Sequence, residues 1–344
     1  MSKWIELDEA EREVTAQAIA KGKGIDPESV EKDWWVTTVL KTLFGLAIGK
    51  YAYFKGGTSL SKGWNLINRF SEDIDIALYR DFFLKEKGVA CARCENNNQI
   101  KLLRKASRDY VLGELRFLLE EALVAAGLDV KVDGVNTHMT VRGETPIDHD
   151  ADPTVLLVRY PSIFANNHTY VKPVVKVEIS CLSMKEPFEV RHIASLISEE
   201  FADEDNETVC DIATISPART FLEKAFLLNE EFQRRSPRTM RMSRHLYDLE
   251  KLMDSSYGKE ALADGALYRT IVEHRRKFYH VSGVDYDMDM PEQIAFCPQG
   301  DLLERFRVDY DNMKSSFIYG NSLDFETLIK RLEELQGRFR AVGV

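Results

Sequence analysis

Two aspartates separated by one residue, Asp73 and Asp75, are the side chains of this sequence best suited to chemistry. They lie in "DIDIAL", an alternating apolar run typical of a β-strand, so both carboxylates should leave the same face of a sheet. Carboxylates held about 7 Å apart repel one another unless a cation lies between them. Mg²⁺ is the simplest partner, because it prefers oxygen ligands and keeps positions open for water and phosphate oxygens.

A glycine turn precedes the aspartates in "FKGGTSLSKG". Adjacent glycines let the backbone approach an anion closely, and the hydroxyl residues that follow would stand at a helix start, where free amides also favour phosphate. A tight turn and a solvated aspartate pair explain the two motifs separately, but their combination favours a nucleoside triphosphate site. The predicted phosphate-binding residues of the turn are Gly56, Gly57, Thr58, Ser59 and Ser61.

The composition limits the class of protein. A chain of 344 residues is long enough for two domains, and a formal net charge of −10 does not suit a general nucleic-acid coat, so any such contact should be a local patch. The 5 scattered cysteines favour a reducing compartment. No signal peptide and no apolar run of about 18 residues is recognisable, so we expect a soluble, cytoplasmic protein without a membrane partner.

The periodicity predicts an α+β fold. Apolar residues recur at helical spacing in residues 4–47 and 99–127. Strands of a mixed or antiparallel sheet are predicted for "KYAYF", for "DIDIAL" and for the short β-branched runs between residues 128 and 181. The acidic stretch "SEEFADEDNET" is the best linker, and the segments after it are helical. We therefore expect a domain over residues 1–200, with a helical insertion at about 99–127, and an all-helical domain over 210–344.

The string "FKGGTSLSKGWNLINRFSEDIDI" resembles the AbiEii/AbiGii-type toxin branch of the DNA polymerase β-like nucleotidyltransferases, a branch that includes the MenT toxins. The stretches "EKDWWVTTVL", "VKVEIS", "RTFLEKAFLLNEE", "RMSRHLYDLEKL" and "DYDNMKSSFIYG" resemble it in the same order, so the likeness covers most of the chain. The resemblance implies a nucleotidyltransferase domain with a small mixed sheet, acting as the toxin of a toxin–antitoxin or phage-defence (abortive infection) system.

The resemblance also implies roles for individual residues. Asp73, Asp75 and Glu178 would be the carboxylates that hold two Mg²⁺ ions, although Glu178 is also explained as one more strand glutamate. Arg69 and Ser71 match positions beside the first aspartate, where they would bind the triphosphate or brace the loop.

Two further positions of the family fall on predicted helices of the second half. Lys224 matches a lysine that contacts nucleotide phosphates, and Asp248 matches an aspartate of the last motif; an exposed lysine and an ordinary ion-pair aspartate remain the alternatives. Many relatives have Arg-Asp where this chain has Arg244 and His245, so the acidic role is assigned to Asp248.

The acceptor is indicated by "QRRSPRTMRMSRH", in which Arg238, Arg241 and Arg244 would form a basic ridge if the segment were helical. The ridge would bind RNA, grip the triphosphate, or pair with acids such as Asp203 and Glu204. The resemblance implies addition of nucleotides from an NTP to the 3′ end of tRNA, with a neighbouring antitoxin protein as partner. Transfer to a protein hydroxyl and a non-catalytic nucleotide-binding module remain alternatives.

Overall fold

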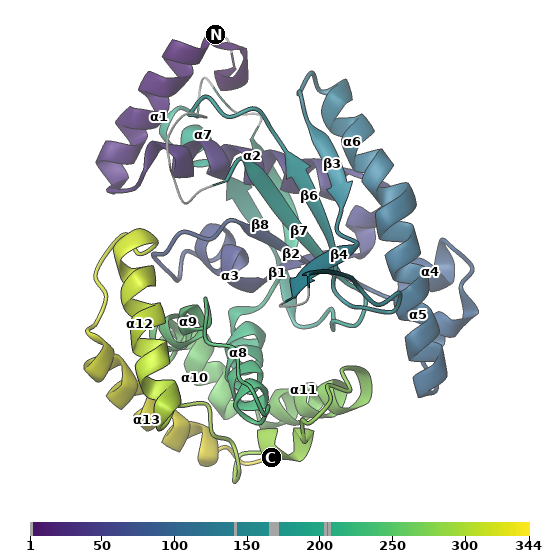
Figure 1. The fold of residues 1–344 in the computed structure, drawn as a ribbon, viewed down its shortest axis with the longest axis vertical. Coiled ribbons are helices and arrows are strands. Elements are labelled where there is room, and N and C mark those ends of the chain that lie inside the picture. Colours follow the sequence, from purple (N-terminus) through teal and green to yellow (C-terminus); the bar gives the residue numbers. More distant parts are fainter. Residues whose placement is uncertain (1–2, 141–142, 165–171, 203–204, 206–207) are drawn as a thin grey trace. The chain divides into compact units, whose positions relative to one another are not determined.

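The computed structural model describes residues 3–140, 143–164, 172–202, 205 and 208–344 of the chain (Figure 1). Two compact units are present, residues 1–63 with 71–214 and residues 64–70 with 215–344. A sheet with helices makes up the first unit and helices make up the second, which confirms the predicted α+β class. The unit boundaries differ from the predicted 1–200 and 210–344, since residues 64–70 group with the helical unit and a last strand follows the predicted linker.

The first unit contains every strand of the two sheets. Its helical segments are η1 (Trp4–Glu6), α1 (Glu9–Lys23), α2 (Pro27–Gly45), η2 (Ala47–Tyr51), α3 (Gly56–Thr58), the π-helical η3 (Ser59–Gly63), α4 (Asp81–Lys85), η4 (Ala90–Arg93), α5 (Asn97–Tyr110), the π-helical η5 (Val111–Leu115), α6 (Arg116–Ala125) and α7 (Leu196–Glu200). Its strands are β1 (Ala52–Lys55), β2 (Asp73–Leu78), β3 (Lys131–Gly134), β4 (Thr137–Thr140), β5 (Gly143–Pro146), β6 (Thr154–Arg159), β7 (Val174–Ser180), β8 (Phe188–Ala194) and β9 (Val209–Ile215).

Seven strands form one mixed sheet in the order β3-β6-β7-β2-β1-β9-β8, and β4 pairs with β5 in a separate hairpin. The central strand β2 runs parallel to β7 and antiparallel to β1. Strand β6 is antiparallel to both β3 and β7, whereas β9 is parallel to β1. Because β9 belongs to this sheet, the sheet continues beyond the predicted acidic linker, of which residues 203, 204, 206 and 207 lie outside the described residues.

One face of the central strands is apolar and buried. Ile74 and Ile76 of β2 lie in register with Val177 and Ile179 of β7, and all four are 0% exposed. Helix α2 packs on these two strands, as Figure 1 shows. Since side chains alternate along a strand, the residues between these apolar positions point to the opposite face, where they are only partly buried.

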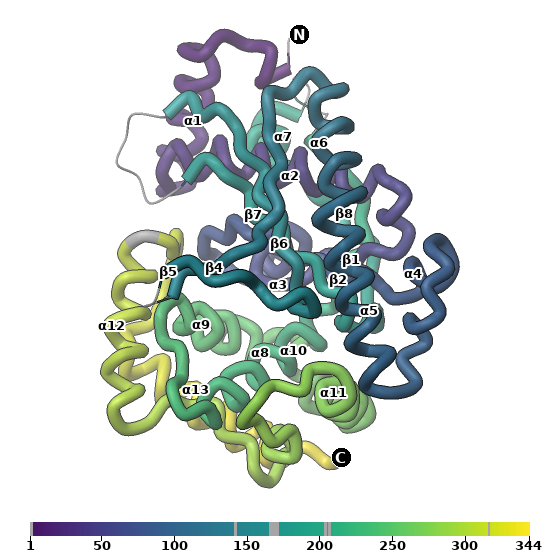
Figure 2. The backbone as a smooth tube through the Cα atoms, turned by 45° about the vertical axis from the view of Figure 1, so that its right-hand side comes forward, coloured from purple at the N-terminus to yellow at the C-terminus, as the bar shows by residue number. Residues whose placement is uncertain are grey.

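The helix expected over residues 99–127 is confirmed, with one irregularity. Figure 2 shows α5 and α6 following one another along a continuous path, with the π-helical segment η5 between them. Gly127 follows α6 with a φ of 82°, the left-handed conformation that glycine adopts readily at a helix C-terminus.

Among the described residues, no helix is both long and apolar enough to span a bilayer.

The second unit is built from helices around an aromatic core. Phe226 packs edge-on against Tyr268 at a ring distance of 4.9 Å, and Phe339 lies 5.0 Å from Phe296 and 5.4 Å from Phe221. Its helical segments are α8 (Pro217–Phe232), α9 (Ser243–Leu252), α10 (Ser256–Ala263), α11 (Gly265–Phe278), η6 (Tyr286–Asp289), α12 (Asp301–Ser316) and α13 (Phe325–Arg340).

A buried polar cluster lies beside this core. Asp289, which is 0% exposed, accepts a hydrogen bond of 2.8 Å from the side chain of Asn229. Arg275 donates to both carboxylate oxygens of Glu230 at 2.5 and 2.7 Å. Burial, followed by the charge of Glu230, raises the pKa of Asp289 to about 8. Asp289 is therefore expected to be protonated at neutral pH.

The raised pKa of Asp289 predicts a pH-dependent stability. The folded state holds this proton more tightly than the unfolded state, whose carboxyl titrates near 3.8, so the free energy of unfolding should fall as pH rises from about 4 to about 8, by on the order of a few kcal/mol. Asp289→Asn keeps a neutral side chain of the same shape and should flatten this dependence. Urea unfolding at a series of pH values measures the free energy of unfolding of the unchanged protein and of the variant. An equally steep fall with pH in the variant would contradict the assignment of this dependence to Asp289.

Candidate active site

The partly exposed face of the central sheet carries the predicted carboxylates. Asp73 and Asp75 occupy alternate positions of β2, and Asp75 lies in register with Glu178 on the parallel neighbour β7. Residues in register on adjacent strands project to the same face. The structure therefore brings Asp73, Asp75 and Glu178 to one face, opposite the buried isoleucines and valines.

Two lysines that the sequence interpretation missed lie on the same face. Lys176 is in register with Asp73, and Lys55 at the end of β1 is in register with Asp75. The ammonium of Lys176 donates to Glu178. Burial alone would lower the pKa of Lys176. The negative charges of Glu178, Asp73 and Asp75 have the larger effect, so the pKa of Lys176 is raised above its ordinary value. The alternation in "VKVE" was the signal, because a lysine two residues before Glu178 must share its face.

The carboxylates fit a divalent cation by residue type and by backbone position. Hard cations prefer carboxylate oxygens, and Asp73, Asp75 and Glu178 occupy neighbouring positions on two adjacent strands. Among the described residues, however, no three carboxylate, histidine or cysteine side chains converge closely enough to hold an ion, and the Glu178 carboxylate binds Lys176. Binding of a cation would therefore require the Lys176 side chain to move.

The first glycine of the turn is explained by its contact with Asp75. Gly56 has a φ of 77°, and a Cβ atom built on it would lie 2.0 Å from Oδ2 of Asp75. Both the backbone conformation and the close approach exclude a larger residue. The turn therefore lies directly against one carboxylate of the pair.

Gly56→Ala should destabilise the fold and disturb the position of Asp75. The left-handed conformation and the clash with the Asp75 carboxylate should together lower the free energy of unfolding by about 1–3 kcal/mol and displace that carboxylate. Gly22→Ala, where a Cβ meets no atom within 4 Å, is the matched control. Denaturant unfolding of the two variants makes the comparison, and equal stability would contradict the explanation.

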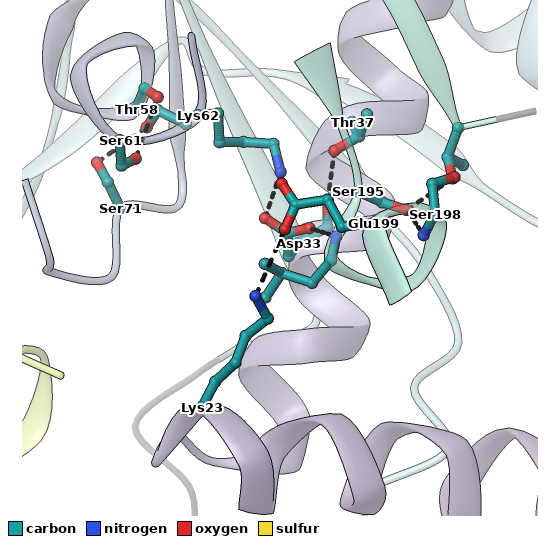
Figure 3. A network of polar contacts seen from close by, with 12 residues as sticks. Lys23, Asp33, Thr37, Thr58, Ser61, Lys62, Ser71, Ser195, Ser198 and Glu199 are labelled. Atoms are coloured by element: carbon teal, nitrogen blue, oxygen red, sulfur yellow. Dashed lines mark hydrogen bonds and ion pairs between the residues drawn. The ribbon is translucent and has the colours of Figure 1, made fainter. Parts of the chain in front are cut away.

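The predicted phosphate-binding hydroxyls make contacts within the turn itself. Thr58 Oγ1 lies 2.9 Å from Ser71 Oγ and 2.5 Å from the backbone oxygen of Asp73. Ser59 donates to the backbone oxygen of Gly56, and Ser61 donates to that of Thr58. Figure 3 shows Thr58, Ser61 and Ser71 gathered at this point. These contacts favour the bracing alternative for Ser71, because they tie the turn to the start of β2.

The end of the turn is anchored by a buried ion pair. Lys62 Nζ lies 2.5 Å from Oδ1 of Asp33 on α2, and the second carboxylate oxygen of Asp33 accepts a hydrogen bond of 2.7 Å from the amide of Leu196 (Figure 3). Both side chains of the ion pair are about nine-tenths buried, at 8% and 11% exposed. Asp33 thus links the π-helical segment η3 to the helix α2 and to the start of α7.

The predicted residues of the second half form a buried cluster within the helical unit. Arg69 donates to both carboxylate oxygens of Asp248 at 2.7 Å, and Lys224 Nζ lies 2.8 Å from Oδ2. The side chain of Asp248 is 0% exposed and that of Lys224 is 8% exposed. All three residues are predicted site residues, but no sequence pattern indicates that Arg69 and Lys224 share one carboxylate.

The electrostatics of this cluster follow from burial and mutual charge. Burial alone would raise the pKa of Asp248, but Arg69 and Lys224 hold it far below its ordinary value. Burial lowers the pKa of Lys224, and Asp248 offsets this only in part. The pKa of His245 falls well below 6.5, through burial and then through Lys224 and Arg244, so this histidine stays neutral at ordinary pH.

The expected arginine ridge is wrong. Helix α8 ends at Phe232 and α9 begins at Ser243, so most of the arginine segment lies in turns between them and has no helical spacing. Arg238 donates to Glu231 at 2.6 and 3.0 Å, and Arg241 has a φ of 60°. Pro237 in the segment and the left-handed Arg241 disfavour a continuous helix. Asp203 and Glu204, the predicted partners, lie outside the described residues.

Comparison with known proteins agrees with the predicted resemblance. Residues 40–331 match a family described as the nucleotidyl transferase AbiEii toxin of type IV toxin–antitoxin systems. No curated protein sequence matches significantly. Among solved structures, the nucleotidyltransferase toxin MenT4 from Mycobacterium tuberculosis H37Rv is similar, at 15% identity and a TM-score of 0.43, covering 96% of this chain and 99% of that one. Because the family match spans most of its length, this chain belongs to the AbiEii family of nucleotidyltransferase toxins.

Proposed function

We propose that this toxin transfers a nucleotide from a nucleoside triphosphate to an RNA acceptor, the 3′ end of tRNA. The observation that carries the proposal is the row of Asp73, Asp75 and Glu178 on one partly exposed sheet face, backed by a buried apolar face. Nucleoside triphosphates and tRNA are cytoplasmic, so the reaction would take place there. Membership of a toxin–antitoxin family also implies a cognate antitoxin.

Asp73, Asp75 and Glu178 would together hold divalent cations, and we propose two Mg²⁺ ions. When bound, such ions neutralise phosphate charge and favour ionisation of an attacking hydroxyl. In the transfer, the acceptor hydroxyl releases its proton to solvent and its oxygen bonds to the α-phosphorus, while the bond from that phosphorus to the bridging oxygen breaks and pyrophosphate leaves. The carboxylates of the chain would fix the positions of the cations, and glycine at position 56 leaves the Asp75 carboxylate the space that it occupies.

The buried cluster of the helical unit offers a net positive charge. Arg69 and Lys224 share the single carboxylate of Asp248. The positive charge of Arg244 also acts on Lys224 and lowers its pKa further. We propose that Lys224 contributes to binding of the triphosphate, with Asp248 and Arg69 fixing its position. Because Nε and Nη2 of Arg69 already bind Asp248, we propose that Arg69 braces this carboxylate and does not bind phosphate directly.

We propose that the sheet unit, predicted as residues 1–200, carries the nucleotidyltransferase chemistry and that the helical unit, predicted as residues 210–344, contributes to acceptor binding. Support for the second part comes from the arginine segment. Arg238 is 62% exposed although it pairs with Glu231, and Arg241 lies 5.9 Å from the Phe317 ring. An arginine beside an aromatic ring is a suitable surface for an unpaired base.

Labelling identifies the acceptor. The protein is incubated with each α-labelled triphosphate, Mg²⁺ and either total RNA or lysate protein, and the proposal expects label in small RNA. Label in protein would instead establish transfer to a protein hydroxyl. Absence of label from every acceptor would leave only a nucleotide-binding module and would contradict transfer.

The arginine segment can be tested separately. If Arg238 and Arg241 bind RNA, replacing both by alanine should weaken acceptor binding more than triphosphate binding, and should reduce the salt dependence by roughly one logarithmic unit of slope for each lost phosphate contact. Arg307→Ala, which removes an arginine paired with Glu304 and Glu326, is the control. Unchanged acceptor affinity in the double variant would contradict this role.

A further inference from the structure

The sheet face that carries the predicted metal ligands also carries a cation of the chain. Lys176 stands in register with Asp73 across β2 and β7, two residues before Glu178 on its own strand. Its ammonium forms an ion pair with Glu178 and interacts electrostatically with Asp73 and Asp75. One side chain therefore interacts with all three carboxylates.

The arrangement answers an electrostatic problem. Three carboxylates on neighbouring positions of two strands repel one another, and part of this face is shielded from water, since Glu178 is 27% exposed. A positive charge among them offsets that repulsion when no metal ion is bound. The Lys176 side chain is itself 40% exposed, so it has solvent space into which it can move.

We propose that Lys176 is an internal counter-ion of the carboxylate face, which stabilises Asp73, Asp75 and Glu178 in the metal-free protein and competes with a divalent cation for them. The inference rests on the proposed function, because it takes these carboxylates as the metal ligands. Metal binding then has to displace the ammonium from Glu178, which weakens the affinity for the ion. Lys176 is a positioning residue in this scheme, because it acts through the carboxylates.

Mn²⁺ alone provides the test, with no nucleotide present. The free hexaaqua ion is followed by its electron paramagnetic resonance signal during titration of the full chain. Lys176→Met should bind Mn²⁺ on the order of tenfold more tightly than the unchanged protein, and the gain should shrink as salt is raised. Lys176→Arg keeps the charge and should bind as the unchanged protein does.

Lys131→Met is the matched control, because it removes one positive charge from the same sheet at strand β3, where Lys131 pairs with Asp133. It should leave Mn²⁺ affinity unchanged. In chelator, Lys176→Met should also melt at a lower temperature than the unchanged protein and should recover more on addition of Mn²⁺. Lys176→Gln is a second neutral variant, should the methionine variant fail to fold.

Two results separate failure of this inference from failure of the proposed function. If Asp75→Ala abolishes Mn²⁺ binding but Lys176→Met and Lys176→Gln bind as the unchanged protein does, the counter-ion role is overturned and the metal assignment stands. If Asp75→Ala and Glu178→Gln both bind Mn²⁺ as tightly as the unchanged protein, the carboxylate face is not the metal site, and the inference falls with it.

Discussion

Replacing Asp75 by alanine should reduce nucleotide transfer by about a thousandfold or more, because the proposed cations would lose a ligand that lies beside both Asp73 and Glu178. Asp73→Ala should have an effect of the same order. Initial rates with saturating labelled triphosphate measure the loss, and expression of the variants in a bacterial host should no longer slow growth.

Two controls separate lost chemistry from lost structure. Asp75→Asn keeps the size of the side chain that packs against Gly56, so it should fold normally and still be inactive. Asp133→Asn changes a carboxylate of the same unit that pairs with Arg159 on the β3–β6 edge, and it should remain active. Near-normal transfer by Asp75→Asn would refute the metal-ligand role of this position.

The second large effect concerns stability. Asp248→Ala removes the only carboxylate that the described structure pairs with Lys224, and leaves Arg69 and Lys224 buried as like charges. Removing one partner of a buried ion pair typically costs about 3–5 kcal/mol, because the remaining charges stay desolvated. Urea unfolding followed by circular dichroism measures the change.

Asp254→Ala is the matched control for this loss. Asp254 also binds two cations, Arg331 and Arg338, but its side chain is 49% exposed. Water can solvate those arginines when the carboxylate is removed, so the cost should stay below about 1 kcal/mol. If the two variants lose similar free energies of unfolding, burial does not increase the cost of removing the Asp248 carboxylate.

Much of the sheet site followed from local pattern. Alternation in "DIDIAL" was enough to predict that Asp73 and Asp75 share a face, because a strand has a period of two, whereas Glu178 was indicated only by the family resemblance. The position of Glu178 beside Asp75 depends on strand register, which no local pattern reveals. Lys176 follows the same rule as the aspartates, but a lysine in a strand is also explained as an ordinary solvated residue, so its type alone does not indicate the site.

The helical unit was less accessible to sequence reasoning. Its helices have clear periodicity, but the pairing of Arg69 with Asp248 joins residues 179 positions apart, and no spacing indicates such a contact. The three-residue spacing of arginines predicts a helix face only where the chain is helical, whereas Pro237 and the left-handed Arg241 lie in the turns between α8 and α9. Tertiary contacts therefore determine the ion pairing and the conformation of these segments, and the periodicity of the sequence does not reveal either.

The separation of Arg69 from Asp248 has a consequence for newly made toxin. Residues 64–70 belong to the helical unit, yet they are translated long before the rest of it. A ribosome that adds about 5–20 residues per second needs roughly 10 to 35 s to travel from Arg69 to Asp248. Throughout that interval the guanidinium of Arg69 has no carboxylate to bind at this position. A nascent chain that is released or cleaved before residue 248 therefore cannot close the ion cluster, so truncated products should lack a folded helical unit.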